Sequence, residues 1–133
     1  MSMNHLIAAS LIASLAGPAF SQDQSAGQGE YMVACAVCHG ETAMGDGPFA
    51  SLMNVEVPGL TGLSAANEGI FPYLEVFMIV DGRTGVRSHG TVMPIWGDRY
   101  SRTAREEFGF YGAEVITRGR VGVLVDYLES IQE

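Results

Sequence analysis

The chain has 133 residues, enough for one domain, and 47% of them are hydrophobic, so a packed core is feasible. Its seven basic residues are all arginine and stand against fifteen acidic residues, which gives a formal charge of −8. This balance argues against binding to nucleic acid and against electrostatic docking on anionic lipid, and it favours a basic protein partner.

The first segment, residues 1–21, is predicted to be a secretory signal peptide. An apolar run, Leu6–Ala16, is followed by Gly17 and Pro18, and Ala19-Phe20-Ser21 gives a small-x-small cleavage pattern before Gln22. The run is too short for a stable membrane span, which takes about twenty apolar residues. We therefore expect export to the periplasm and a mature domain of residues 22–133.

The first half of the mature region predicts short helices and long loops. Residues 23–28 are expected to be a flexible lead-in, and residues 28–37 a short helix. Residues 40–62 are rich in Gly and Pro and predict a loop, with a turn of helix near residues 49–53. The apolar stretch 71–80 predicts a helix, although its β-branched residues leave a strand open.

The second half continues the same pattern, so the predicted fold class is all-α. Residues 85–98 are expected to be a loop, and residues 101–108 a surface helix. Residues 120–131 predict an amphipathic helix, because four apolar residues recur at i, i+3, i+4 and i+7: Val121, Leu124, Val125 and Leu128. Long loops are unusual in a small domain unless something other than the chain fills its centre.

Residues 35–39 read Cys-Ala-Val-Cys-His, the CxxCH signature of c-type haem attachment. Cys35 and Cys38, one helical turn apart, can each add to a vinyl group of a porphyrin, and His39 can then offer an imidazole nitrogen to the iron. A zinc site is disfavoured, because only His39 and His89 accompany the two cysteines and His39 adjoins Cys38. A thioredoxin-like pair would need strands alternating with helices, and a disulfide-bonded CxxC is the remaining alternative. We therefore expect one covalent haem c.

Residues around this motif resemble a class I cytochrome c over nearly the whole mature region. Gly27 and Tyr31, eight and four residues before Cys35, match the glycine and the aromatic residue of that family's first helix. Tyr127-Leu128 matches the aromatic–aliphatic pair of its last helix. The resemblance implies the cytochrome c fold, in which these two helices cross closely at Gly27 and Tyr31 packs against Tyr127.

The stretch Gly45-Asp46-Gly47-Pro48 is also similar to the family. By analogy, the Pro48 carbonyl accepts the Nδ1 proton of His39, which would fix the ring and raise its donor strength. Pro58 is the alternate acceptor.

The sixth iron ligand has six candidates in the mature region: Met32, Met44, Met53, Met78, Met93 and His89. Met44 follows His39 too closely to reach the opposite face of a porphyrin. Met32 and Met78 are expected in the core, and Met53 precedes the apolar segment expected to form the distal wall. Met93-Pro94-Ile95-Trp96 resembles the family's Met-Pro ligand loop, so we expect His39 and Met93 as metal ligands. His89 would give bis-His ligation instead.

The haem propionates are expected to meet Trp96 first and Arg83 second, with Arg87 and Arg99 as further candidates. With both axial positions filled, no position is free for substrate. The expected function is electron transfer, as a carrier or a haem subunit rather than an enzyme, with redox partners that have a basic docking face. The alternative is a five-coordinate haem protein that binds a small gas or reacts with peroxide.

Overall fold

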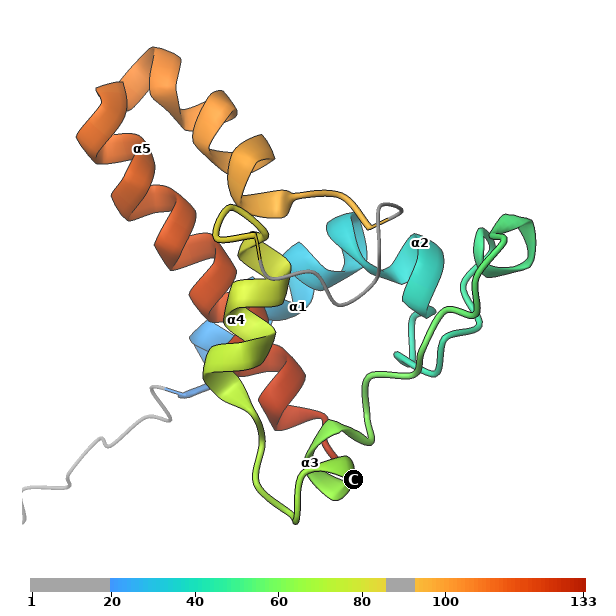
Figure 1. Cartoon of the computed structure of the whole chain (residues 1–133). Helices are drawn as coiled ribbons and strands as arrows, with labels where there is room; N and C mark the ends of the chain where they lie inside the picture. The colour runs from blue at the N-terminus through green and yellow to red at the C-terminus, as the bar shows by residue number, and fades with distance from the viewer. Residues whose placement is uncertain (1–19, 86–92) are drawn as a thin grey trace, which may run out of the picture.

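The computed structural model describes residues 20–85 and 93–133, and their side chains from residue 25 onward. The elements are α1 (Phe20–Ala34), α2 (Ala36–His39), the 3-10 turn η1 (Ala50–Leu52), α3 (Leu63–Ala66), α4 (Tyr73–Asp81) and α5 (Trp96–Ser130) (Figure 1). The described residues contain no strand, and the all-α prediction is confirmed. Nearly all of the predicted signal peptide lies outside the described residues, as do Arg87 and His89.

Helices α1 and α5 cross where neither has room for another side chain. A Cβ at Gly27 would overlap the Val123 carbonyl oxygen and would lie 2.7 Å from the Tyr127 Cβ. One turn further on, Tyr31 is fully buried, and its ring centroid lies 5.4 Å from that of Tyr127. The close crossing predicted for these residues is confirmed.

The N-terminal part of α1 corrects one prediction, because residues 23–28 are helical rather than a flexible lead-in. Gly27 and Gly29 lower the intrinsic helix propensity there. The contact with α5 compensates: besides the crossing at Gly27, Arg120 of α5 donates two hydrogen bonds to Glu30, at 2.7 and 2.9 Å. Packing against a neighbour therefore decides the structure of this segment.

Helix α4 forms close to its predicted position and is not a strand. Pro72 precedes its first residue, and Gly82 ends it in the left-handed conformation (φ 68°). Val76 and Val80 are buried. The Tyr73 hydroxyl donates a hydrogen bond of 2.6 Å to Asp126, which links α4 to α5.

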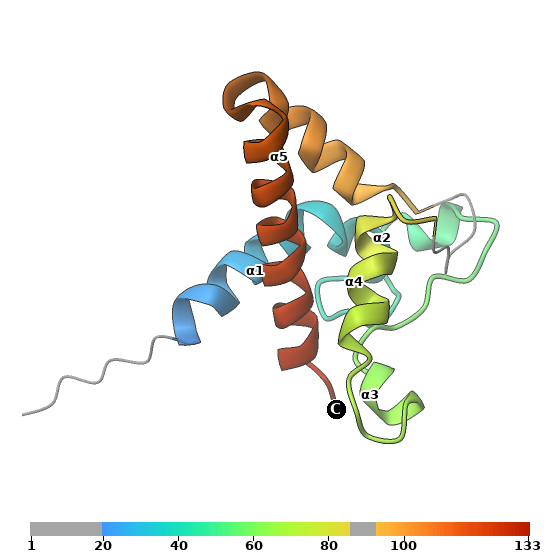
Figure 2. The same ribbon diagram turned by 60° about the vertical axis from the view of Figure 1, so that its left-hand side comes forward.

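Helix α5 joins the two predicted C-terminal helices into one bent element. The bend lies at Gly109, whose φ of 65° and ψ of −175° are open in practice only to glycine. In Figures 1 and 2 the two limbs meet at an apex that stands away from the rest of the fold. The four apolar residues predicted to form the inner face of the second limb are buried. Among the described residues, no helix combines the length and the apolar character needed to cross a membrane.

Candidate functional site

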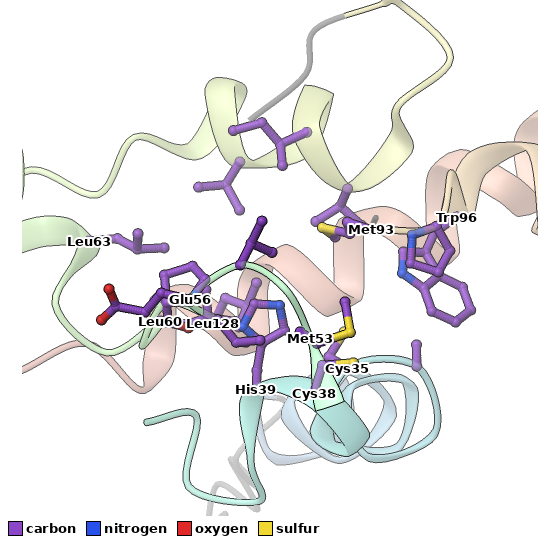
Figure 3. A pocket seen from close by; sticks show the side chains of 18 of the residues that line it. Cys35, Cys38, His39, Met53, Glu56, Leu60, Leu63, Met93, Trp96 and Leu128 are labelled. Carbon is purple, nitrogen blue, oxygen red and sulfur yellow. Dashed lines mark hydrogen bonds between the residues drawn. The ribbon is translucent and has the colours of Figure 1, made fainter. Parts of the chain in front are cut away.

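A cavity of about 780 Å³ lies between α2, α4 and the two ends of α5 (Figure 3). Helix α4 contributes Val76, Ile79 and Val80 to its lining, and α5 contributes Trp96 and Leu128. Half of the remaining lining comes from residues 53–63, and all of that part except Glu56 is apolar. The volume is in the range of pockets that hold a small molecule or a cofactor.

All three reactive residues of the CxxCH motif line this cavity. Cys35 precedes α2, and its carbonyl oxygen accepts hydrogen bonds from the backbone N–H groups of Cys38 (3.0 Å) and His39 (2.9 Å). This single tight turn brings two thiols and an imidazole to one wall of the cavity. Both cysteines are free thiols.

The environment of Cys35 differs from that of a redox-active thiol pair. Burial, with smaller effects of Cys38 and Glu30, raises the pKa of Cys35 to about 12. Nucleophilic cysteines of thioredoxin-like proteins have a lowered pKa and lie beside a sheet, whereas Cys35 is held between two helices. The described residues hold no group of three or more His, Cys, Asp or Glu side chains placed to bind a metal ion.

The His39 ring is oriented by the Pro58 carbonyl oxygen, which lies 3.0 Å from Nδ1. Because a carbonyl oxygen only accepts, Nδ1 carries the proton and Nε2 keeps its lone pair. Burial lowers the pKa of His39, and the hydrogen bond to Pro58 opposes part of that shift. The prediction that Pro48 is the acceptor is wrong, and the alternate residue, Pro58, takes this place.

Two glycines explain why Pro58, and not Pro48, accepts the hydrogen bond of His39. At Gly45 (φ 83°) a Cβ would overlap the Val57 carbonyl oxygen and lie 3.0 Å from the Pro58 carbonyl carbon, so its absence lets residues 57–58 approach His39. At Gly47 a Cβ would lie 2.6 Å from the carbonyl oxygens of Ala36 and Cys38. Pro48 therefore follows a segment that packs on the backbone of α2, not on the His39 ring.

Two methionines reach the cavity, Met53 from the loop after η1 and Met93 from the segment before α5. Figure 3 shows Met93 and Trp96 on the side facing away from the α2 wall. Met32 and Met44 are 41% and 56% exposed and do not line the cavity. The prediction that Met32 belongs to the core is therefore wrong.

Arg83 and Arg99, two of the arginines expected near a propionate, have protein partners in this structure. The Arg99 guanidinium lies 5.2 Å from the centre of the ring of Trp96, which lines the cavity. Neither Arg99 nor Arg83 lines the cavity itself. Arg83 donates to Asp81 at 2.6 and 2.7 Å and to Glu114 at 2.6 Å. In this structure the donors of Arg83 are directed to these two carboxylates, and its contact with a propionate stays a prediction.

The three residues Asp81, Arg83 and Glu114, here called the Arg83 clamp, hold both ends of the segment that carries Met93. A Cβ at Gly97 would lie 2.7 Å from the Arg83 Nε and from the Asp81 carbonyl oxygen. The side chains of Asp81 and Arg83 therefore pack directly against Gly97, at the start of α5, and link the end of α4 to it.

Two carboxylates that the sequence analysis missed, Glu56 and Glu75, are the charged residues of the cavity lining. Glu56 belongs to an irregular loop and Glu75 to the first turn of α4. A single glutamate in either setting reads as a solvated side chain, so only the fold reveals that the two share a cavity.

Comparisons of the chain with family models, with curated proteins and with solved structures found no match. The functional interpretation rests on the motif and on the geometry of the cavity.

Proposed function

We propose that this chain is a class I c-type cytochrome, with the cytochrome c fold, which transfers electrons through one covalently bound haem c. The observation that carries the proposal is that the Cys35, Cys38 and His39 side chains line a single apolar cavity, which Met93 lines from a distant part of the chain. A bound haem supplies one-electron chemistry through its iron. The protein is proposed as a carrier or as the haem subunit of an oxidoreductase, and not as an enzyme.

The residues present fit such a group. The thiols of Cys35 and Cys38 have the spacing needed for two thioether bonds, and His39 offers Nε2, since Nδ1 donates to Pro58. The Met93 thioether supplies a soft second ligand. Val76, Ile79 and Val80 of α4 give this cavity an apolar wall that suits the porphyrin face.

The edge of the cavity supports two further parts of the proposal. Trp96 has an indole N–H, and Arg99, whose guanidinium lies over the Trp96 ring, is proposed as a cation that could meet a propionate. Glu56 and Glu75 contribute to the net charge of −8, which favours a redox partner with a basic docking face. Residues 1–21 are proposed to direct the protein to the periplasm.

The proposal is tested by the colour of the protein after maturation in a host that attaches c-type haem. Wild-type protein should keep its pigment through acid–acetone extraction, and so should Met44→Ala, whose side chain is exposed outside the cavity. The double variant Cys35→Ala, Cys38→Ala should lose it. Non-extractable haem in the double variant, or colourless wild-type protein, would contradict covalent attachment.

Two single variants then identify the distal ligand. Met93→Ala should lower the reduction potential and let carbon monoxide bind the ferrous protein readily, whereas Met53→Ala should leave both properties unchanged. The reverse result would assign the ligand to Met53. Rapid binding of carbon monoxide to the wild-type protein would favour the five-coordinate alternative.

A further inference from the structure

The apex of α5 carries exposed aromatic side chains that the haem site does not use. Phe108, Phe110 and Tyr111, here called the aromatic apex, are 51%, 74% and 82% exposed. Single exposed apolar residues are common on soluble proteins, but a cluster of large rings on a projecting turn is typical of an interaction site.

The apex is a tight turn. Gly109 gives a bend that other residues cannot adopt without strain, and a Cβ at Gly112 would lie 2.7 Å from the Phe108 Cβ. The Arg105 guanidinium lies 5.4 Å from the centre of the Phe110 ring.

The apex is also far from the cavity. Helix α5 lines the cavity at Trp96 and Leu128, near its two ends. At 1.5 Å per residue, the limb from Trp96 to Phe108 spans about 18 Å and the limb from Tyr111 to Leu128 about 26 Å. Figures 1 and 2 agree that the apex lies where the limbs meet, away from α2 and α4. A partner bound there leaves the cavity uncovered.

The charges beside the rings indicate the kind of partner. Glu106 and Glu107 are exposed and, like Arg105, form no ion pair with the described residues, whereas Glu114 pairs with Arg83 and Arg118, so the unpaired charges beside the rings sum to −1. Two copies that met apex to apex would bring these carboxylates together, and an anionic bilayer would repel them. A protein surface with basic side chains would attract them.

The size of the apex constrains the shape of that surface. Three rings offer much less than the roughly 800 Å² per partner of a standard stable interface. A flat partner would therefore bury too little area, whereas a concave one would enclose the rings on several sides, as anchor residues are enclosed in known hot spots.

We propose that the aromatic apex inserts into an apolar pocket, rimmed by lysine or arginine, on a partner protein. The evidence for this docking comes from the apex alone. Its consequence, that the partner holds the chain while the haem stays available for electron exchange, rests on the proposed function.

The test begins with the haem-loaded full chain in its native cells. A photo-crosslinking residue replaces Phe110 in one variant and Leu74, which is 69% exposed on α4, in the control. The expected result is one adduct with a different protein from position 110 and none from position 74. That protein, once identified and purified, becomes the probe for binding measurements.

Three double variants then test the chemistry of the contact. Phe110→Ser, Tyr111→Ser should weaken binding at least tenfold, and Glu106→Gln, Glu107→Gln should weaken it several-fold and reduce its dependence on salt. Ile70→Ser, Leu74→Ser removes two side chains that are each 69% exposed elsewhere and should have no effect. The haem spectrum, the potential and the rate of reduction by a small reagent should be the same in all three.

Several results would overturn the proposal. One is that position 110 gives no more adduct than the control position, and another is that the only adduct joins two copies of the chain. A third is that the protein binds phosphatidylcholine or phosphatidylglycerol vesicles and that this binding requires the rings. Equal affinity of the wild-type and Phe110→Ser, Tyr111→Ser proteins for the partner would also overturn it. If the chain holds no haem but the adduct and its sensitivity to these variants persist, the docking site stands and only the proposed function fails.

Discussion

The two sides of the cavity are held in different ways. On the cysteine–histidine side, residues 35–58, the backbone sets the geometry: Gly45 and Gly47 leave no room for a Cβ, and the Pro58 carbonyl orients His39. On the methionine side, residues 81–85 and 93–97, the Arg83 clamp links the end of α4 to α5 through the ion pairs of Arg83 with Asp81 and Glu114. The first side therefore depends on steric fit, whereas the second combines a close contact at Gly97 with the charges of three side chains.

The largest effect is expected on the side that is set by steric fit. Gly47→Val places a branched side chain where even a Cβ would lie 2.6 Å from two carbonyl oxygens of residues 36–38. Backbone cannot move aside cheaply, so we expect a loss of about 3 kcal/mol in the free energy of unfolding, measured by urea titration and circular dichroism. Covalent haem content should fall with it.

Gly29→Ala is the control for this substitution. Gly29 lies in α1 with no atom within 4 Å of an added Cβ, and alanine favours a helix by up to about 1 kcal/mol. Unfolding of Gly47→Val at the same urea concentration as wild type would show that the cysteine–histidine side adjusts as readily as the methionine side.

A smaller effect is expected in the clamp. Arg83→Met leaves the Asp81 carboxylate, 7% exposed, without its main partner, and we expect a loss of about 2 kcal/mol, because Arg83 itself is partly solvated. Arg102→Met breaks a pair whose side chains are 70% and 56% exposed and should cost no more than about 0.5 kcal/mol.

The same variant tests what the clamp positions. In the haem-loaded protein, Arg83→Met should speed carbon monoxide binding to ferrous iron, because Met93 is held less firmly. If stability falls and carbon monoxide binding stays slow, the clamp joins α4 to α5 without positioning Met93.

The sequence could predict the features that depend on residues close together in the chain, and it could not predict those that depend on distant residues. The periodic spacing of 120–131 and the glycine at the helix crossing are local signals, and the fold confirms both predictions. The CxxCH motif is also local, and the fold brings its three side chains to one cavity, while its interpretation as a haem site stays a proposal. The choice between Pro48 and Pro58 depends on φ at Gly45, which no spacing reveals. The role of Arg83 depends on Glu114, 31 residues away and beyond a bend at Gly109. A long-range ion pair leaves no pattern in the chain.

The smallest effect concerns α4, which faces both sides. Tyr73→Phe removes the hydrogen bond to Asp126 and should cost about 0.5–1 kcal/mol at pH 7. Burial and that hydrogen bond raise the pKa of Tyr73 to about 12 from an ordinary value of 10. Because the pKa of Tyr73 is higher in the folded state, the folded protein is stabilised as long as the hydroxyl is protonated. This contribution to the free energy of unfolding is complete below pH 10 and is lost as the pH rises from 10 to 12.

The measurement is the difference in unfolding free energy between wild type and Tyr73→Phe across that range. The difference should shrink as the pH rises. A difference that stays constant from pH 8 to 12 would mean that the hydroxyl contributes through packing and not through its proton.

Trp96 is the chain's single tryptophan, and it stacks with Tyr100 at a centroid distance of 5.8 Å on the wall of the cavity. Its ultraviolet emission therefore reports on one place in the molecule, the junction between the methionine segment and α5. A coloured group in the cavity would quench that emission by energy transfer over so short a range. Trp96 is thus an intrinsic fluorescence probe. During unfolding, recovery of tryptophan emission would report that this wall has separated from the rest of the site.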